Sequence, residues 1–176
     1  MGNHKKEASS EHYKDHHRPH LIAQRLEDGP DSVYLKEFIY GSVDGAVTTF
    51  AIVAGVAGAG MSAEVIIILG FANLLADGFS MAASNYLGTR AENQNREKIR
   101  QMENDEIERH PEGEEEEVRQ IFAKKGFQGQ LLEDAVKVIT SDKEAWIDTM
   151  LQDEHGMSLQ GNDPIKSGFA TFSAFC

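Results

Sequence analysis

A run of closely spaced acidic residues between positions 101 and 120 offers the most distinctive chemistry in the sequence. Nine residues of this run are acidic and two are basic. Two pairs of its glutamates, Glu103 with Glu106 and Glu114 with Glu117, are three positions apart, so each pair shares a helix face. Two antiparallel helices with these faces together repel each other unless a cation lies between them. The spacing therefore favours a divalent-metal site over the solvated acidic face that such runs usually form.

A second group of residues, later in the chain, is suited to complete such a site. Met150 and Glu154 are four positions apart and so lie on one face of a helix. Oxygen ligands alone suit magnesium, calcium or manganese, whereas a thioether favours a softer transition-metal ion. Because a lone methionine is usually a core residue, Met150 shifts the expected metal preference only slightly.

Two carboxylates lie inside otherwise uncharged apolar runs. Asp44 is the only charged residue in 38–60, and Asp77 is the only one in 65–87, with Met81 one helical turn after it. Burial away from water raises the pKa of a carboxyl group, so it holds either a proton or a cation. Such residues usually mark an ion or proton path, although a structural carboxylate bonded to a neighbouring Ser or Thr is the alternative.

The two apolar runs predict a transmembrane helical hairpin. Each run has 23 residues, and a helix needs about 20 to span a bilayer. Glycines and alanines at four-residue spacing weaken a soluble helix but let helices approach closely in a membrane. The turn at 61–64 has no Lys or Arg, whereas both flanking segments do, so the positive-inside rule places both ends in the cytoplasm.

The remaining chain predicts an all-α protein in which the hairpin is followed by a cytoplasmic helical metal-binding domain. Helical composition continues unbroken to His110, where Pro111 ends it, and Asp142 or Ser141 is suited to cap a last helix that runs to His155. The predicted regions are a polar His-rich tail (1–35), transmembrane helices 1 and 2 (36–88), the acidic cytoplasmic domain (89–162) and the start of a third transmembrane helix (163–176).

Composition excludes several classes of protein. With 17 basic and 29 acidic residues the net charge is −12, which argues against a nucleic-acid surface. The single cysteine, Cys176, excludes an intrachain disulfide. A soluble carboxylate-bridged iron oxidase is disfavoured because no Glu-x-x-His pair occurs. We expect no enzymatic activity.

Taken together, four segments resemble the vacuolar iron transporter family, which exchanges ferrous iron for protons. The segments are YGSVDGAVTTFAIVAG, ANLLADGFSMAASNYL, MENDEIERHPEGEEEEVRQIFAKKG and DKEAWIDTMLQDEHG. The resemblance covers residues 36–176. It implies an integral protein of a vacuolar or bacterial inner membrane, a homodimer, five transmembrane helices and a three-helix cytoplasmic metal-binding domain.

The resemblance also implies roles for individual residues. Asp44 and Met81 correspond to ligands of the translocation path, on which Asp77 is the second intramembrane carboxylate. The implied metal ligands of the cytoplasmic domain are Glu103, Glu106, Glu114, Glu117, Met150 and Glu154. Leu151 stands where many members have a second Met. The expected ion is Fe²⁺, with Zn²⁺ and Mn²⁺ as alternatives.

Two functions are therefore expected. The first is a transporter that moves iron out of the cytosol in exchange for protons. The second is a membrane-anchored metal-binding or sensing module without transport, because the last three transmembrane helices of the family are missing from this sequence.

Overall fold

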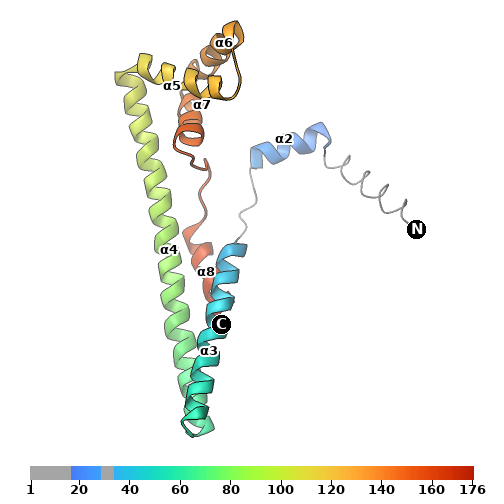
Figure 1. Ribbon diagram of the computed structural model, residues 1–176, viewed down its shortest axis with the longest axis vertical. Helices are drawn as coiled ribbons and strands as arrows, with labels where there is room; N and C mark the ends of the chain where they lie inside the picture. The colour runs from blue at the N-terminus through green and yellow to red at the C-terminus, as the bar shows by residue number, and fades with distance from the viewer. Residues whose placement is uncertain (1–16, 29–33) are drawn as a thin grey trace, which may run out of the picture. The chain divides into compact units, whose positions relative to one another are not determined.

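The computed structural model describes residues 17–28 and 34–176, and every regular element in these residues is a helix (Figure 1). The all-helical class expected from the sequence is confirmed. The elements are α2 (Pro19–Asp28), α3 (Leu35–Gly58), α4 (Ala63–Arg109), α5 (Pro111–Lys124), α6 (Gly129–Thr140), α7 (Lys143–Thr149), the π-helix η1 (Met150–Glu154) and α8 (Pro164–Phe175).

Helix α2 belongs to a separate N-terminal unit and lies within the predicted polar tail. It begins at Pro19, whose fixed φ suits the first helical position and whose missing N–H is not needed there. The N–H groups of Leu21 and Ile22 both donate to the carbonyl of Arg18. Part of the tail is thus helical, which its polar composition did not indicate. His17 and His20 are exposed, and the tail histidines His4, His12 and His16 lie outside the described residues.

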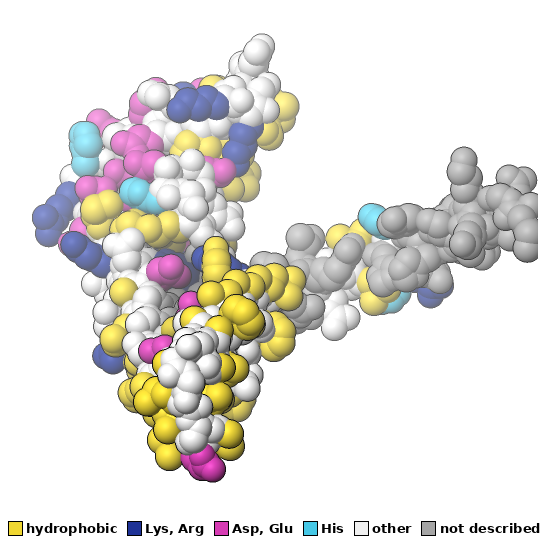
Figure 2. Space-filling view, turned by 60° about the horizontal axis from the view of Figure 1, so that its bottom comes forward, with side chains coloured by type: hydrophobic (Ala, Val, Ile, Leu, Met, Phe, Trp, Pro, Cys, Tyr) yellow, Lys and Arg dark blue, Asp and Glu magenta, His cyan; other side chains and the backbone are white. Residues whose placement is uncertain are grey.

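Helices α3 and α4 run antiparallel and side by side, and the surface of α3 and of the first half of α4 is largely apolar (Figures 1 and 2). Both are long and apolar enough to cross a membrane, with mean hydropathies of 1.4 and 1.9 over their most apolar windows. Those windows are only 11% and 6% buried, whereas a core helix of a soluble protein is mostly buried. Phe50, Phe71 and Phe79, for example, are 65–73% exposed. This surface suits lipid rather than water.

Helix α8 packs against both α3 and α4. Gly41 and Gly45 of α3 meet its backbone so closely that an added Cβ would lie 2.6 Å from the carbonyl oxygen of Thr171 and 2.3 Å from that of Phe175. The amide of Asn85 in α4 donates to the hydroxyl of Thr171 at 2.6 Å. The glycine spacing noted in the sequence thus allows the close approach of α8.

Helix α4 continues as one rod of 47 residues from its apolar part to Arg109, as expected. Helix α5 begins at Pro111, because proline fits the first turn of a helix. Helices α5 to η1 then pack on the end of α4 around a core of Ile107, Val118, Val136, Trp146, Ile147, Met150 and Leu151. We call residues 99–157 the acidic bundle.

The last helix of the acidic bundle differs from the expected uninterrupted α-helix. It begins as predicted, with the Asp142 carboxylate accepting from the N–H groups of Glu144 and Ala145 at 3.0 and 3.3 Å. After Thr149 it widens into η1, in which the N–H of His155 donates to the carbonyl of Met150 at 3.2 Å. Gly156, with a φ of 64°, then ends the helix.

Candidate metal centre

Helices α4 and α5 bring three carboxylates together inside the acidic bundle. Oxygens of Glu103, Glu106 and Glu114 all lie within 4.8 Å of one another. Glu103 is 1% exposed and Glu114 is 6% exposed, and the Oε2 atom of each is buried without a hydrogen-bond partner. A buried polar atom without a partner destabilises the fold unless a ligand completes its coordination. These two oxygens therefore mark a position suited to a cation.

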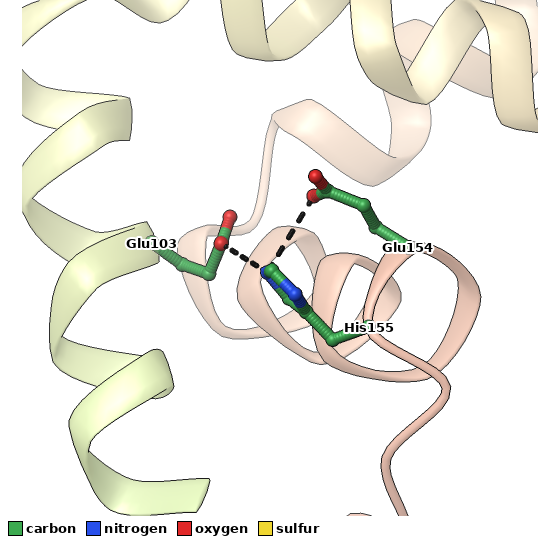
Figure 3. A group of neighbouring side chains, drawn as sticks. All are labelled: Glu103, Glu154 and His155. Atoms are coloured by element: carbon green, nitrogen blue, oxygen red, sulfur yellow. Dashed lines mark hydrogen bonds and ion pairs between the residues drawn. The ribbon is translucent and has the colours of Figure 1, made fainter. Parts of the chain in front are cut away.

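A second group extends the cluster to η1 (Figure 3). The Nε2 atom of His155 lies 2.7 Å from Oε1 of Glu103 and 3.7 Å from Oε2 of Glu154. Ligand atoms of these three residues also lie within 4.8 Å of one another. Glu103 belongs to both groups, so the two donor sets are continuous.

Burial and the charges of neighbouring carboxylates raise the pKa values of Glu103, Glu114 and Glu117. Burial, followed by the charges of Glu117 and Glu103, raises the pKa of Glu114 to about 7. Burial also raises the pKa of Glu103, although the hydrogen bond from His155 opposes this change. The pKa of Glu117 is raised by burial and by Glu154. The cluster therefore has an electrostatic environment that disfavours ionised carboxylates and favours any bound cation.

The pKa of His155 is raised in turn, first by its hydrogen bond to Glu103 and also by the charge of Glu154. Protonated His155 is the one cationic side chain paired with this cluster among the described residues.

The outer acidic residues of the bundle, in contrast, are paired with Lys or Arg. Arg119 donates to Glu115 at 2.8 Å and to Glu116 at 2.6 Å, and Arg100 donates to Asp148 at 2.7 Å. Further pairs are Lys125 with Asp153 and Lys143 with Glu108. Within the part of the chain that the structure describes, no Lys or Arg pairs with Glu103, Glu106, Glu114, Glu117 or Glu154. These Lys and Arg residues thus neutralise carboxylates on the outer surface of the acidic bundle and none in the cluster around Glu103.

The predicted metal ligands of the acidic bundle lie in different surroundings. The structure brings Glu103, Glu106 and Glu114 into one group, and burial together with the charge of Glu154 raises the pKa of Glu117. Met150 is fully buried and belongs to the hydrophobic core. Metal coordination by its thioether stays a prediction, as do the ligand roles of the glutamates.

His155 is the residue of this centre that sequence reasoning missed. Its spacing from the glutamates on α4 and α5 carries no periodic signal, since the contact joins residues 52 positions apart. Gly156, directly after His155, indicates in the sequence that a helix ends here. It does not indicate which way the imidazole of His155 points.

The predicted translocation residues lie on the apolar parts of α3 and α4. Asp44 is exposed on α3, and Asp77 and Met81 are half-buried on α4. The hydroxyl of Thr48 donates to the backbone carbonyl of Asp44 at 2.8 Å rather than to its carboxylate. The alternative to a translocation role was a structural carboxylate bonded to a neighbouring Ser or Thr. In the described helices the carboxylate of Asp44 has no such partner. Its role in translocation stays a prediction.

These features define a class: an integral membrane protein with apolar helices and a buried carboxylate cluster suited to a divalent cation. The model of the VIT family matches residues 35–176, and the chain belongs to this family. The resemblance stated from the sequence is thereby confirmed.

Curated relatives support the same assignment. The chain is 38% identical over 149 residues to a protein named "Vacuolar iron transporter" from Toxoplasma gondii, covering 82% of this chain and 49% of the relative. It is 34% identical over 150 residues to the protein of that name from Plasmodium berghei, covering 83% and 55%. It is 29% identical over 160 residues to "Vacuolar iron transporter 1" from Arabidopsis thaliana, covering 90% and 60%. The chain spans about half the length of the first two relatives.

Proposed function

We propose that the chain takes part in transport of ferrous iron out of the cytosol in exchange for protons. The observation that carries this proposal is the contrast within the acidic bundle. Arg100, Arg119, Lys125 and Lys143 pair with outer carboxylates, while two buried oxygens of Glu103 and Glu114 have no partner. The family and the names of the relatives support iron as the transported ion.

The acidic bundle gathers the cation in this proposal. A divalent ion among Glu103, Glu106 and Glu114 replaces like-charge repulsion with attraction and supplies a partner for both orphan oxygens. Glu106, Glu117 and Glu154 are exposed residues, so the cluster opens to solvent on one side and an ion has access to it. Carboxylates bind divalent ions such as Mn²⁺, and Fe²⁺ and Zn²⁺ are accommodated better once nitrogen takes part.

Translocation uses the apolar helices. Asp44 and Asp77 each hold a proton or a cation within a membrane-spanning segment, which provides the exchange. Met81, one helical turn after Asp77, offers a soft ligand. The arrangement we propose is a membrane hairpin of α3 and α4 with both ends in the cytoplasm. The acidic cytoplasmic domain at 89–162, which contains the acidic bundle, lies on that side. In it α8 begins a third span at 163–176, and the working unit is a homodimer.

Reconstitution into proteoliposomes tests this function. Vesicles containing the chain and an entrapped iron-quenched dye should take up Fe²⁺ when the inside is acidic, and Asp44→Asn should abolish the uptake. Glu64→Gln, which removes an exposed carboxylate at the start of α4, is the matched control and should transport normally. Fe²⁺ uptake no faster than in empty vesicles would reject transport by this chain and favour the membrane-anchored metal-binding module.

A further inference from the structure

His155 directly follows a deeply buried part of the acidic bundle. The π-helical turn that carries it is anchored by Met150 and Leu151, which are 0% and 1% exposed. The N–H of His155 bonds to the carbonyl of Met150, and the N–H of Met157 bonds to that of Leu151 at 2.8 Å. The backbone on both sides of His155 is therefore held by hydrogen bonds to two buried core residues, which restricts where the imidazole can lie.

The imidazole nitrogen occupies a place suited to a metal ligand. Its distances of 2.7 Å to Glu103 and 3.7 Å to Glu154 bracket the separation of two ligands on one ion. With metal–ligand bonds of about 2.1 Å that separation is roughly 3.0–3.4 Å for octahedral or tetrahedral geometry. A small movement of the side chains thus places all three donor atoms around a single cation.

Independent observations point to a ligand here rather than to a simple ion pair. Glu103 is 1% exposed, and its Oε1 atom contacts His155 while its Oε2 atom has no partner at all. Glu114, 6% exposed, contributes a second orphan oxygen to the adjoining group. One imidazole does not satisfy both carboxylates, so the pair between His155 and Glu103 leaves the cluster incomplete.

We propose that His155 is a nitrogen ligand of this metal centre and determines its selectivity among divalent ions. The inference rests on the proposed function, because it requires the acidic bundle to bind a divalent cation. Imidazole suits iron and zinc, whereas magnesium, calcium and manganese are bound well by oxygen alone. A centre with His155 therefore favours Fe²⁺ and Zn²⁺ over Mn²⁺ and Mg²⁺, and the same glutamates without it do not.

Trp146 permits a test on the full chain in detergent. It is the only tryptophan and lies in the core of the acidic bundle, so its fluorescence reports unfolding of this bundle alone. Binding of an ion to the folded bundle raises the unfolding midpoint by mass action, and titrations of the midpoint yield the affinity. The histidines of the N-terminal tail are present in every variant, so any contribution from them is the same in each comparison.

The decisive variant is His155→Gln, which replaces the nitrogen donor with an amide of similar length. Its affinity for Zn²⁺ and, under anaerobic conditions, for Fe²⁺ should fall by ~10-fold or more. Loss of a residue that only hydrogen-bonds to a metal ligand already causes a decrease of this size. Its affinities for Mn²⁺ and Mg²⁺ should change less than about threefold. The control His110→Gln removes an exposed histidine at the junction of α4 and α5 and should change neither.

The outcomes separate this inference from the function on which it rests. An equal loss for all four ions, or no loss for any, would overturn the assignment of His155 as the selectivity ligand. The double variant Glu103→Gln/Glu114→Gln tests the centre itself, because it should remove the response to every ion. If that variant kept the full response, the proposed metal centre would fail together with the inference. A metal-free melt of each variant verifies that the bundle is folded.

Discussion

Glu103 and Glu114 lie on two different helices, and each is buried with one carboxylate oxygen that has no hydrogen-bond partner. Burial raises the pKa of both carboxyl groups, and the charge of Glu103 adds to the rise at Glu114. Arg119 and Lys125 pair with other carboxylates, Glu133 and Asp153. Without a cation, the buried carboxylates of Glu103 and Glu114 therefore lower the free energy of unfolding of the acidic bundle. The relationship between these two glutamates leads to the predictions below.

Removing both charges should stabilise the metal-free acidic bundle. For Glu103→Gln/Glu114→Gln we expect a higher unfolding midpoint in EDTA, because two desolvated charges disappear. Each kcal/mol corresponds to about 4–8 °C for a unit of this size. The melt is followed by Trp146 fluorescence. A lower midpoint in EDTA would show that the two carboxylates stabilise the fold without metal.

The stability of the metal-free bundle should depend on pH through Glu114. Because its pKa is about 7 in the folded state, against 4.5 for an ordinary glutamate, the folded state binds more protons between these values. Stability therefore falls as pH rises from 4.5 to 7 and levels off above 7. Glu114→Gln lacks this loss, so its midpoint should exceed that of the wild type by an amount that grows with pH.

Glu116→Gln is the matched control for this pH profile. Hydrogen bonds from Gln120 and Arg119 lower the pKa of Glu116, so its ionised form stabilises the fold slightly at neutral pH. Its replacement should give a difference of the opposite sign, present above pH 4.5 and lost in acid. Parallel profiles for wild type and Glu114→Gln would contradict the raised pKa.

Close packing of α8 on α3 should depend on Gly45. Valine at this position forces its Cβ against the carbonyl of Phe175, whereas Gly55 on the same helix has open space around it. Overpacking typically costs about 1–3 kcal/mol, and the middle of this range, ~2 kcal/mol, corresponds to more than tenfold in an equilibrium.

Maleimide labelling of a reporter cysteine measures this equilibrium. Ser167 of α8 is fully buried, so Ser167→Cys in a Cys176→Ser background is labelled only when α8 separates. Gly45→Val should speed labelling about tenfold or more, and Gly55→Val should not. Equal rates in both variants would mean that α8 is not held at this glycine.

Much of the helical architecture could be predicted because its signals are local. Pro111 ends one helix and starts the next, and Asp142 caps the last one, since each acts on its own backbone neighbours. The face shared by Glu103 and Glu106 follows from helix periodicity alone. These predictions needed no knowledge of tertiary contacts.

The rest depends on contacts between distant parts of the chain. Gly41 and Gly45 indicated close packing in the sequence but not that α8 is their partner. His155 meets Glu103 only because Thr149 is followed by a π-helical turn, and that turn has no periodic signature in the residues. Whether Met150 faces the core or a metal was likewise undecided, because a buried thioether suits both.

Isothermal titration calorimetry of the chain in detergent tests the central claim most directly. We compare the inner variant, in which Glu103, Glu106, Glu114 and Glu117 are changed to Gln, with an outer variant of equal charge. The outer variant changes Glu108, Glu115, Glu116 and Glu144, which are paired with Lys or Arg on the surface of the bundle.

Titration with Mn²⁺, and with Fe²⁺ under anaerobic conditions, should show binding to the wild type and to the outer variant. The inner variant should lose this binding, because its remaining amides do not neutralise a divalent ion. Equal heats for the wild type and the inner variant would contradict the account and identify these glutamates as a solvated acidic surface.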